Sequence, residues 1–80
     1  MKTKIHVHAE IFGKPDCMHC EKAKFLCNQR GIKYSYKELG TDFDFDFIKK
    51  SFPHAKTFPQ ILVDGIHVGG YDDLTKYLEE

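Results

Sequence analysis

The hydrophobic positions in the first half of the chain follow two different periods. Residues 5–12 alternate apolar side chains with polar or aromatic ones, which is the period of a strand. After a break at residues 13–16 (Gly-Lys-Pro-Asp), residues 17–30 are rich in good helix formers. Residues 32–38 alternate again. The first half therefore predicts a strand, a helix and a strand, which together make a β-α-β unit.

Residues 42–47 are ambiguous, because they strictly alternate Asp with Phe. That period is typical of a strand, yet Phe43, Phe47, Ile48 and Phe52 also fall at helical spacing. We favour a helix because aspartates at its start suit the positive end of the helix dipole. Pro53 would end it.

The last third of the chain predicts a hairpin and a final helix. Residues 60–63 and 66–68 flank Asp64-Gly65, a strong signal for an antiparallel hairpin with a type I′ turn. Residues 71–78 carry an apolar stripe at helical spacing. The predicted fold class is α/β with the order β-α-β-α-β-β-α, in which a mixed four-stranded sheet is flanked by three helices.

Composition limits the classes of partner. The 80 residues suffice for a single domain over 1–80, and 41% hydrophobic residues can bury enough surface to fold. Twelve basic residues balance twelve acidic ones, so we expect neither nucleic acid nor a membrane as a partner. No apolar run approaches the roughly 18 residues of a membrane span. The first residues also lack the apolar run of a signal peptide, so we expect a cytoplasmic location.

The pair Cys17 and Cys20 is the strongest chemical signal. A C-x-x-C without an export signal indicates a redox pair or half of a metal site. A cysteine at a helix start faces free backbone N–H groups and the positive end of the dipole, which favour the thiolate. Cys17 is therefore the predicted nucleophile. Cys20, about 5 to 6 Å away on the same helix face, can form a disulfide with it.

Other cysteine and histidine residues are weaker candidates. Cys27 lies about 10 Å along the helix from Cys20, too far to share a disulfide or a zinc ion, and we interpret it as a buried apolar residue. His19 either stabilises the Cys17 thiolate or is a solvated spacer. His6 and His8 share a strand face, where an exposed or packed surface is a simpler account than a metal site.

Three blocks of sequence, in order, resemble those of the glutaredoxins, small members of the thioredoxin fold. They are residues 11–24 around the cysteine pair, residues 57–61 (Thr-Phe-Pro-Gln-Ile), and Asp64-Gly65 followed by residues 69–74 (Gly-Gly-Tyr-Asp-Asp-Leu). The resemblance spans nearly the whole chain. It implies a thioredoxin-like fold and a glutathione-dependent thiol–disulfide oxidoreductase that reduces protein disulfides or glutathione mixed disulfides. Cys17 would be the nucleophile and Cys20 the resolving thiol.

The resemblance also implies where glutathione binds. Pro59 matches the family's cis-proline, which would turn the backbone of Phe58 toward Cys17 and let it pair with the cysteinyl backbone of glutathione. Lys14 and Gln60 match positions that hold the glycyl carboxylate. The implied glutathione-binding residues are Lys14, His19, Thr57, Phe58, Pro59, Gln60, Gly70, Tyr71, Asp72 and Asp73. A solvated Lys14 and a merely helix-capping Asp72 or Asp73 are the alternatives.

Two residues depart from the family pattern. The commonest glutaredoxin sequence has Pro and Tyr between the cysteines, whereas this chain has Met18 and His19. Losing the proline affects the first turn of the helix and the reduction potential. Losing the tyrosine removes an aromatic wall beside the bound glutathione.

Several alternatives stay open at the level of sequence. A thioredoxin served by thioredoxin reductase is disfavoured because the chain has no Trp. An iron–sulfur cluster shared between two protomers is an alternative, although we expect no metal. A redox-silent adaptor is a third. Among protein substrates, the resemblance names ribonucleotide reductase first, and without a large apolar surface we expect a monomer.

Overall fold

The helices and strands follow the predicted order. A computed structural model describes residues 8–79. The elements are β1 (His8–Gly13), α1 (Met18–Gln29), β2 (Lys33–Glu38), α2 (Phe45–Ser51), β3 (Gln60–Val63), β4 (Ile66–Gly69) and α3 (Tyr71–Glu79). The β-α-β-α-β-β-α order is thus confirmed. The first part of the strand predicted over residues 5–12, including His6, lies outside the described residues.

The four strands form one mixed sheet in the order β2-β1-β3-β4. β1 runs parallel to β2 and antiparallel to β3, and β3 pairs antiparallel with β4. Asp64 and Gly65 join the last two strands with φ angles of 52° and 83°. Positive φ at both positions is what a type I′ turn requires, so the predicted hairpin is confirmed.

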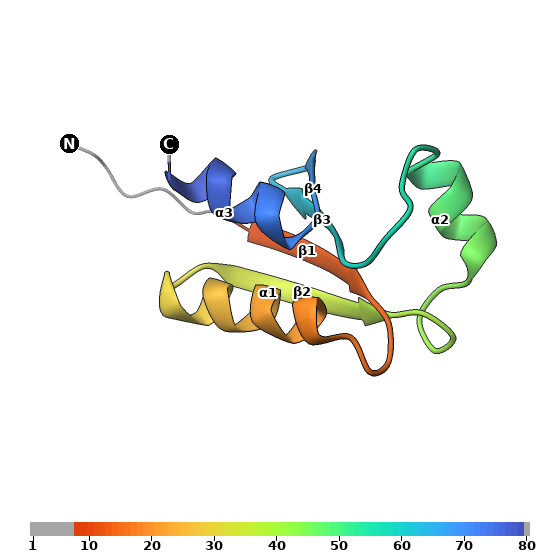
Figure 1. Ribbon diagram of the computed structural model, residues 1–80, viewed down its shortest axis with the longest axis horizontal. Helices are drawn as coiled ribbons and strands as arrows, with labels where there is room; N and C mark the ends of the chain where they lie inside the picture. Colours follow the sequence, from red (N-terminus) through yellow and green to blue (C-terminus); the bar gives the residue numbers. More distant parts are fainter. Residues whose placement is uncertain (1–7, 80) are drawn as a thin grey trace.

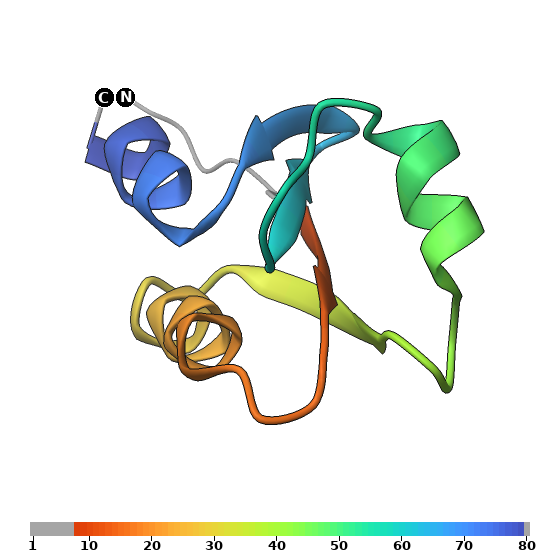
Figure 2. The same ribbon diagram turned by 45° about the vertical axis from the view of Figure 1, so that its right-hand side comes forward.

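The helices cover both faces of the sheet. α1 and α3 lie side by side on one face, and α2 lies alone on the other (Figures 1 and 2). Neighbouring residues of a strand point to opposite faces, so Ile11 points toward α1 and α3 while Phe12 points toward α2. The two faces therefore have separate cores.

The core under α1 and α3, which we call the aliphatic cluster, is made of small and branched side chains. All of its central members are at most 7% exposed. They are Ala9, Ile11, Ala23, Leu26, Cys27, Ile61, Val63 and Leu74. Cys27 is thus a buried apolar residue, as predicted, and this cluster fixes α1 and α3 against the sheet.

The core under α2, which we call the aromatic cluster, is built on Phe12, Ile48 and Phe52. The partly buried residues Phe43, Ala55, Phe58 and Leu62 pack against it. The ring of Phe12 lies 5.5 Å from that of Phe43 and 5.6 Å from that of Phe52. Aromatic side chains thus dominate this second core.

The ambiguous Asp-Phe segment forms a helix, as favoured, but the helix begins only at Phe45. Asp44 caps it by accepting a hydrogen bond from the Phe47 N–H at 3.0 Å. Phe43 remains extended and pairs with Leu39 in an isolated bridge. Phe43 is thus the residue before the cap that makes a strand-like contact, whereas Asp42 lies in the turn that follows β2.

Candidate active site

Cys17 is the N-cap of α1, directly at the positive end of the helix. Its Sγ accepts a hydrogen bond from the backbone N–H of Cys20 at 3.1 Å. The two cysteines form a disulfide, and their Cα atoms are 5.2 Å apart, within the predicted spacing. Cys20 is fully buried whereas Cys17 is partly exposed. Cys17 is therefore the sulfur that a partner in solution can reach.

The surroundings of Cys17 favour a thiolate when the disulfide is reduced. The free N–H groups of the first helical turn and the helix dipole both place positive potential at its Sγ. The Cys20 N–H is already directed at that sulfur. A thiolate formed there keeps this hydrogen bond, which strengthens when the acceptor is charged.

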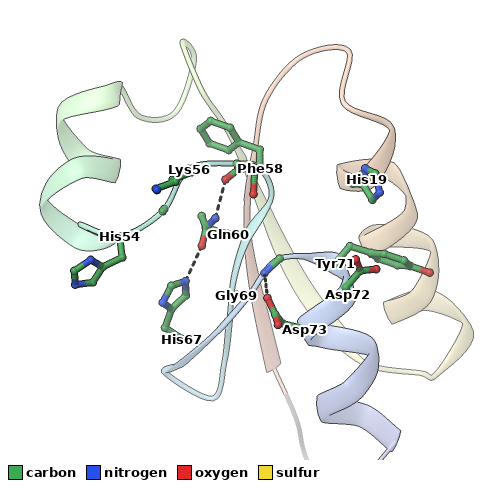
Figure 3. A pocket seen from close by; sticks show the side chains of 13 residues that line it. His19, His54, Lys56, Phe58, Gln60, His67, Gly69, Tyr71, Asp72 and Asp73 are labelled. Atoms are coloured by element: carbon green, nitrogen blue, oxygen red, sulfur yellow. Dashed lines mark hydrogen bonds between the residues drawn. The ribbon is translucent and has the colours of Figure 1, made fainter.

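His19 is exposed and lies beside Tyr71 at the start of α3. The two ring centroids are 6.0 Å apart (Figure 3). Among the described residues, no hydrogen bond joins the His19 ring to Cys17. His19 and Tyr71 therefore lie on the same side of the site, and both line the groove described next.

Two adjacent grooves meet at the loop that precedes β3. One, of about 560 Å³, contains Cys17 and is lined by Lys14, Asp16, Cys17, Met18, His19, Phe45, Lys56, Thr57 and Phe58. The other, of about 540 Å³, runs toward α3 and includes Gly70, Tyr71, Asp72 and Asp73. His19, Lys56, Thr57 and Phe58 line both. Every predicted site residue except the buried Cys20 and Pro59 therefore lines one groove or both.

Pro59 is fully buried, and the peptide bond between Phe58 and Pro59 is cis, as the family resemblance implies. The carbonyl of Pro59 also lies close to Gly70, where an added Cβ atom would meet it at 3.5 Å. The turn into α3 thus packs directly on the cis-proline loop.

The two acidic residues at the start of α3, Asp72 and Asp73, make different contacts. Asp73 accepts a hydrogen bond from the Gly70 N–H at 3.1 Å, so it caps the helix (Figure 3). Gly69, at φ 119°, makes the turn that brings this cap into place. Asp73 therefore caps the helix, and its contact with glutathione stays a prediction. Asp72 is exposed on the groove and its carboxylate forms no hydrogen bond with another described residue.

Gln60 is 5% exposed, and both ends of its side-chain amide are engaged. Its Nε2 donates to the carbonyl oxygen of Thr57 at 2.7 Å, and its Oε1 lies 2.7 Å from Nε2 of His67 (Figure 3). The sequence reasoning missed His67. The predicted hairpin could have indicated this contact. Its turn pairs residue 62 with residue 67 and so places Gln60 diagonally from His67 on one face of the sheet.

Neither a metal centre nor a membrane span is found in the described part of the chain. Within residues 8–79, no three His, Cys, Asp or Glu side chains come together in a way that would hold a metal ion. No helix there has the length and apolar character to cross a bilayer. His8 is exposed on its strand, in line with the simpler account of that histidine.

A disulfide at the start of the first helix, beside a cis-proline loop in a thioredoxin-like fold, defines a class: the thiol–disulfide oxidoreductases of that fold. A family model described as Glutaredoxin matches residues 9–68. The chain belongs to the glutaredoxin family, and its members are thiol–disulfide oxidoreductases.

The chain is similar to several known proteins. Glutaredoxin 3 of Escherichia coli is 38% identical over 71 residues, which cover 84% of this chain and 81% of that protein. Hybrid peroxiredoxin hyPrx5 of Haemophilus influenzae is 39% identical over 67 residues, which cover 84% of this chain but 27% of that longer protein. The crystal structure of a buckwheat glutaredoxin–glutathione complex has a TM-score of 0.76 and 28% identity, covering 89% of this chain and 67% of the buckwheat chain.

Proposed function

We propose that this protein uses glutathione to reduce protein disulfides and glutathione mixed disulfides at Cys17. The observation that carries the proposal is the arrangement of charges around the exposed sulfur. Lys14 and Lys56 line the groove at Cys17, and Asp72 lines the adjoining groove at α3. Glutathione carries carboxylates and an ammonium group, so side chains of both signs suit it. The similarity to buckwheat glutaredoxin, solved with glutathione, supports the same ligand.

The thiol chemistry follows from the exposure of the two sulfurs. The Cys17 thiolate attacks the glutathione sulfur of a mixed disulfide and expels the substrate as its thiolate, leaving glutathione bonded to Cys17. The thiolate of a second glutathione then attacks that bond, releasing oxidised glutathione and the Cys17 thiolate. Alternatively, Cys20 attacks Cys17, releasing glutathione and forming the Cys17–Cys20 disulfide. Two glutathione molecules reduce that disulfide again.

The rim of the groove supports protein substrates as well as small ones. Met18 is 71% exposed and Phe45 is 58% exposed, and both line the groove that contains Cys17. Apolar side chains on a surface are favourable contacts for a partner chain. Ribonucleotide reductase is the protein substrate that we propose first, and the similarity to part of hyPrx5 makes a peroxiredoxin disulfide a second candidate. We further propose a cytoplasmic monomer.

Reduction of a glutathionylated peptide, coupled to glutathione reductase and NADPH, tests the proposal. Cys17→Ser should abolish turnover, because the attacking thiolate is gone. Cys20→Ser should keep part of it, since a second glutathione can resolve the mixed disulfide. If the wild type is inactive with glutathione but active with thioredoxin reductase and NADPH, the protein is a thioredoxin-like reductant instead.

The protein partner needs its own assay. Ribonucleotide reductase is supplied with this protein, glutathione and glutathione reductase as the only source of electrons, and deoxyribonucleotide formation is measured. Turnover that depends on both Cys17 and Cys20 supports the partnership. Turnover that Cys17→Ser leaves unchanged would contradict it.

A further inference from the structure

We propose that His67 is a positioning residue for glutathione: through Gln60 it sets the direction of the Phe58 N–H that pairs with the ligand. The inference rests on the proposed function, because the ligand in question is glutathione. His67 lies on β4, away from the cysteines, and no sequence motif of the active site includes it. The case for it is a chain of hydrogen bonds that ends at the cis-proline loop (Figure 3).

The chain of hydrogen bonds has only one consistent direction. The carbonyl of Thr57 can only accept, so the amide nitrogen of Gln60 must face it. The Gln60 Oε1 is then directed at His67, whose Nε2 must carry the hydrogen. Both the neutral ring protonated at Nε2 and the imidazolium meet this requirement. The contact therefore persists whether or not His67 takes up a second proton.

Holding the Thr57 carbonyl also orients the next N–H group. Phe58–Pro59 is the only cis peptide bond within the described residues, so the Thr57–Phe58 bond is trans. In a planar trans peptide the C=O and the N–H point in opposite directions. The hydrogen bond from Gln60 therefore fixes the Phe58 N–H in the direction away from the Gln60 side chain. Within residues 8–79 that N–H has no protein acceptor, so it is available to a ligand.

His67 is itself held in place by the aromatic cluster. Its ring lies on that of Phe52, with the centroids 4.4 Å apart, and Phe52 is buried at the end of α2. The hairpin fixes its backbone, since His67 pairs with Leu62. Because the ring is held by these two contacts, its Nε2 is a fixed hydrogen-bond donor for the Gln60 Oε1. Without that donor, the Gln60 Oε1 would lose its protein partner, and the amide would be free to rotate away from Thr57.

Three variants separate this role from general packing. His67→Phe keeps a ring against Phe52 but removes the donor. His67→Gln brings an amide N–H near the place of the imidazole Nε2. His8→Phe makes the same substitution at an exposed histidine at the far end of β1, so it serves as the matched control.

The kinetic readout compares two mixed disulfides of one peptide, one with glutathione and one with cysteamine. Cysteamine has no peptide group to pair with Phe58, so only the glutathione form should respond. We expect His67→Phe to raise KM for the glutathionylated peptide about fivefold, equivalent to about 1 kcal/mol, with kcat changed less than about twofold. His67→Gln should restore most of the loss. His8→Phe should match the wild type.

The second readout needs no substrate. In ¹⁵N–¹H spectra of the protein without glutathione, His67→Phe should shift the Phe58 backbone amide and the Gln60 side-chain amide, and His8→Phe should shift neither. Gln60→Met breaks the same connection and should give the same Phe58 shift, and it serves where His67→Phe does not fold. Adding His67→Phe to Gln60→Met should then raise KM no further.

The two readouts distinguish a failure of the proposed function from a failure of the role proposed for His67. If the wild type does not prefer the glutathionylated peptide over the cysteamine form, the proposed function is wrong, and the spectra still test the positioning of Phe58. If the wild type does prefer it, but His67→Phe keeps both the KM and the Phe58 signal of the wild type, then His67 does not position the ligand-binding N–H.

Discussion

The two faces of the sheet bury different kinds of core. On the face under α1 and α3, the aliphatic cluster is closed, and Leu74 and Cys27 are entirely inaccessible to solvent. On the face under α2, the aromatic cluster is open at its rim, and Phe47 remains 40% exposed although its ring lies 5.4 Å from that of Phe12. One face has two helices to cover it, whereas the other has a single helix of seven residues.

The difference separates stability from ligand positioning. The aliphatic cluster anchors α1, which carries Cys17, and α3, which carries Asp72, so it sets the spacing between the sulfur and the acidic side of the groove. The aromatic cluster contacts the cis-proline loop through Phe58 and clamps His67 through Phe52. We expect the first face to dominate the free energy of unfolding and the second to dominate the order of the loop.

The largest effect should come from a cavity in the closed core. Leu74→Ala removes a fully buried side chain, so we expect it to lower the free energy of unfolding by about 3 kcal/mol. Phe47→Ala, on the open face, should cost only about 1 to 2 kcal/mol because 40% of the residue is already exposed to water. Urea unfolding of both oxidised variants measures the difference. Equal losses would mean that the two faces contribute alike.

A polar group in the closed core should have the next largest effect. Cys27 is a free cysteine, outside the disulfide, and its thiol is not accessible to solvent. Cys27→Ser buries a hydroxyl in apolar surroundings and should cost about 2 kcal/mol, more than Cys27→Ala. Turnover per folded molecule should equal that of the wild type in both. A loss of turnover in Cys27→Ala with stability intact would assign this cysteine a redox role.

Alkaline pH should lower the stability of the protein through ionisable groups in and against the aliphatic cluster. Burial raises the pKa of the Cys27 thiol above its ordinary value of 9.0, so the folded protein keeps a proton that the unfolded chain releases. Above about pH 9 the unfolded state is favoured by this release, and stability should fall as pH rises. Burial also raises the pKa of the Tyr36 hydroxyl above its ordinary value of 10.0. Urea midpoints should therefore decline from about pH 9 in the wild type and less steeply in Cys27→Ala.

The smallest effect belongs to the ion pair on the outside of α1. The Oε2 atom of Glu21 lies 3.0 Å from the Nζ atom of Lys24, and the hydrogen bond between them raises the pKa of Lys24. A raised lysine pKa stabilises the folded protein below the ordinary value of 10.5, and the contribution is lost as pH rises through the folded value. Because Glu21 is exposed, Glu21→Gln should cost only about 0.3 kcal/mol at neutral pH. A loss above about 1 kcal/mol would mean that the pair supports the packing of α1.

Most of the fold could be predicted because its signals are local. The alternation of β2, the Asp64-Gly65 turn and the apolar stripe of α3 each report on a few neighbouring residues, and each was confirmed. The Asp-Phe segment, residues 42–47, was ambiguous because so short a run satisfies both periods. The cap at Asp44 is a local signal, whereas the packing of Phe47 on Phe12 depends on the arrangement of the folded chain.

The sequence by itself predicted Cys17 as the nucleophile and Cys20 as its partner, because a C-x-x-C at a helix start lies within four residues. It also indicated the family, through three blocks of sequence in order. It also brought Lys14, Phe58 and Asp72 into one expected site through their motifs. Only the tertiary structure decided what Gln60 does. The Asp64-Gly65 turn makes Gln60 and His67 diagonal neighbours, but the His67 ring also lies against Phe52 at the end of α2, and no local pattern contains that contact. A buried amide takes its partners from whatever the fold brings within hydrogen-bonding distance, and that is a property of the packed molecule.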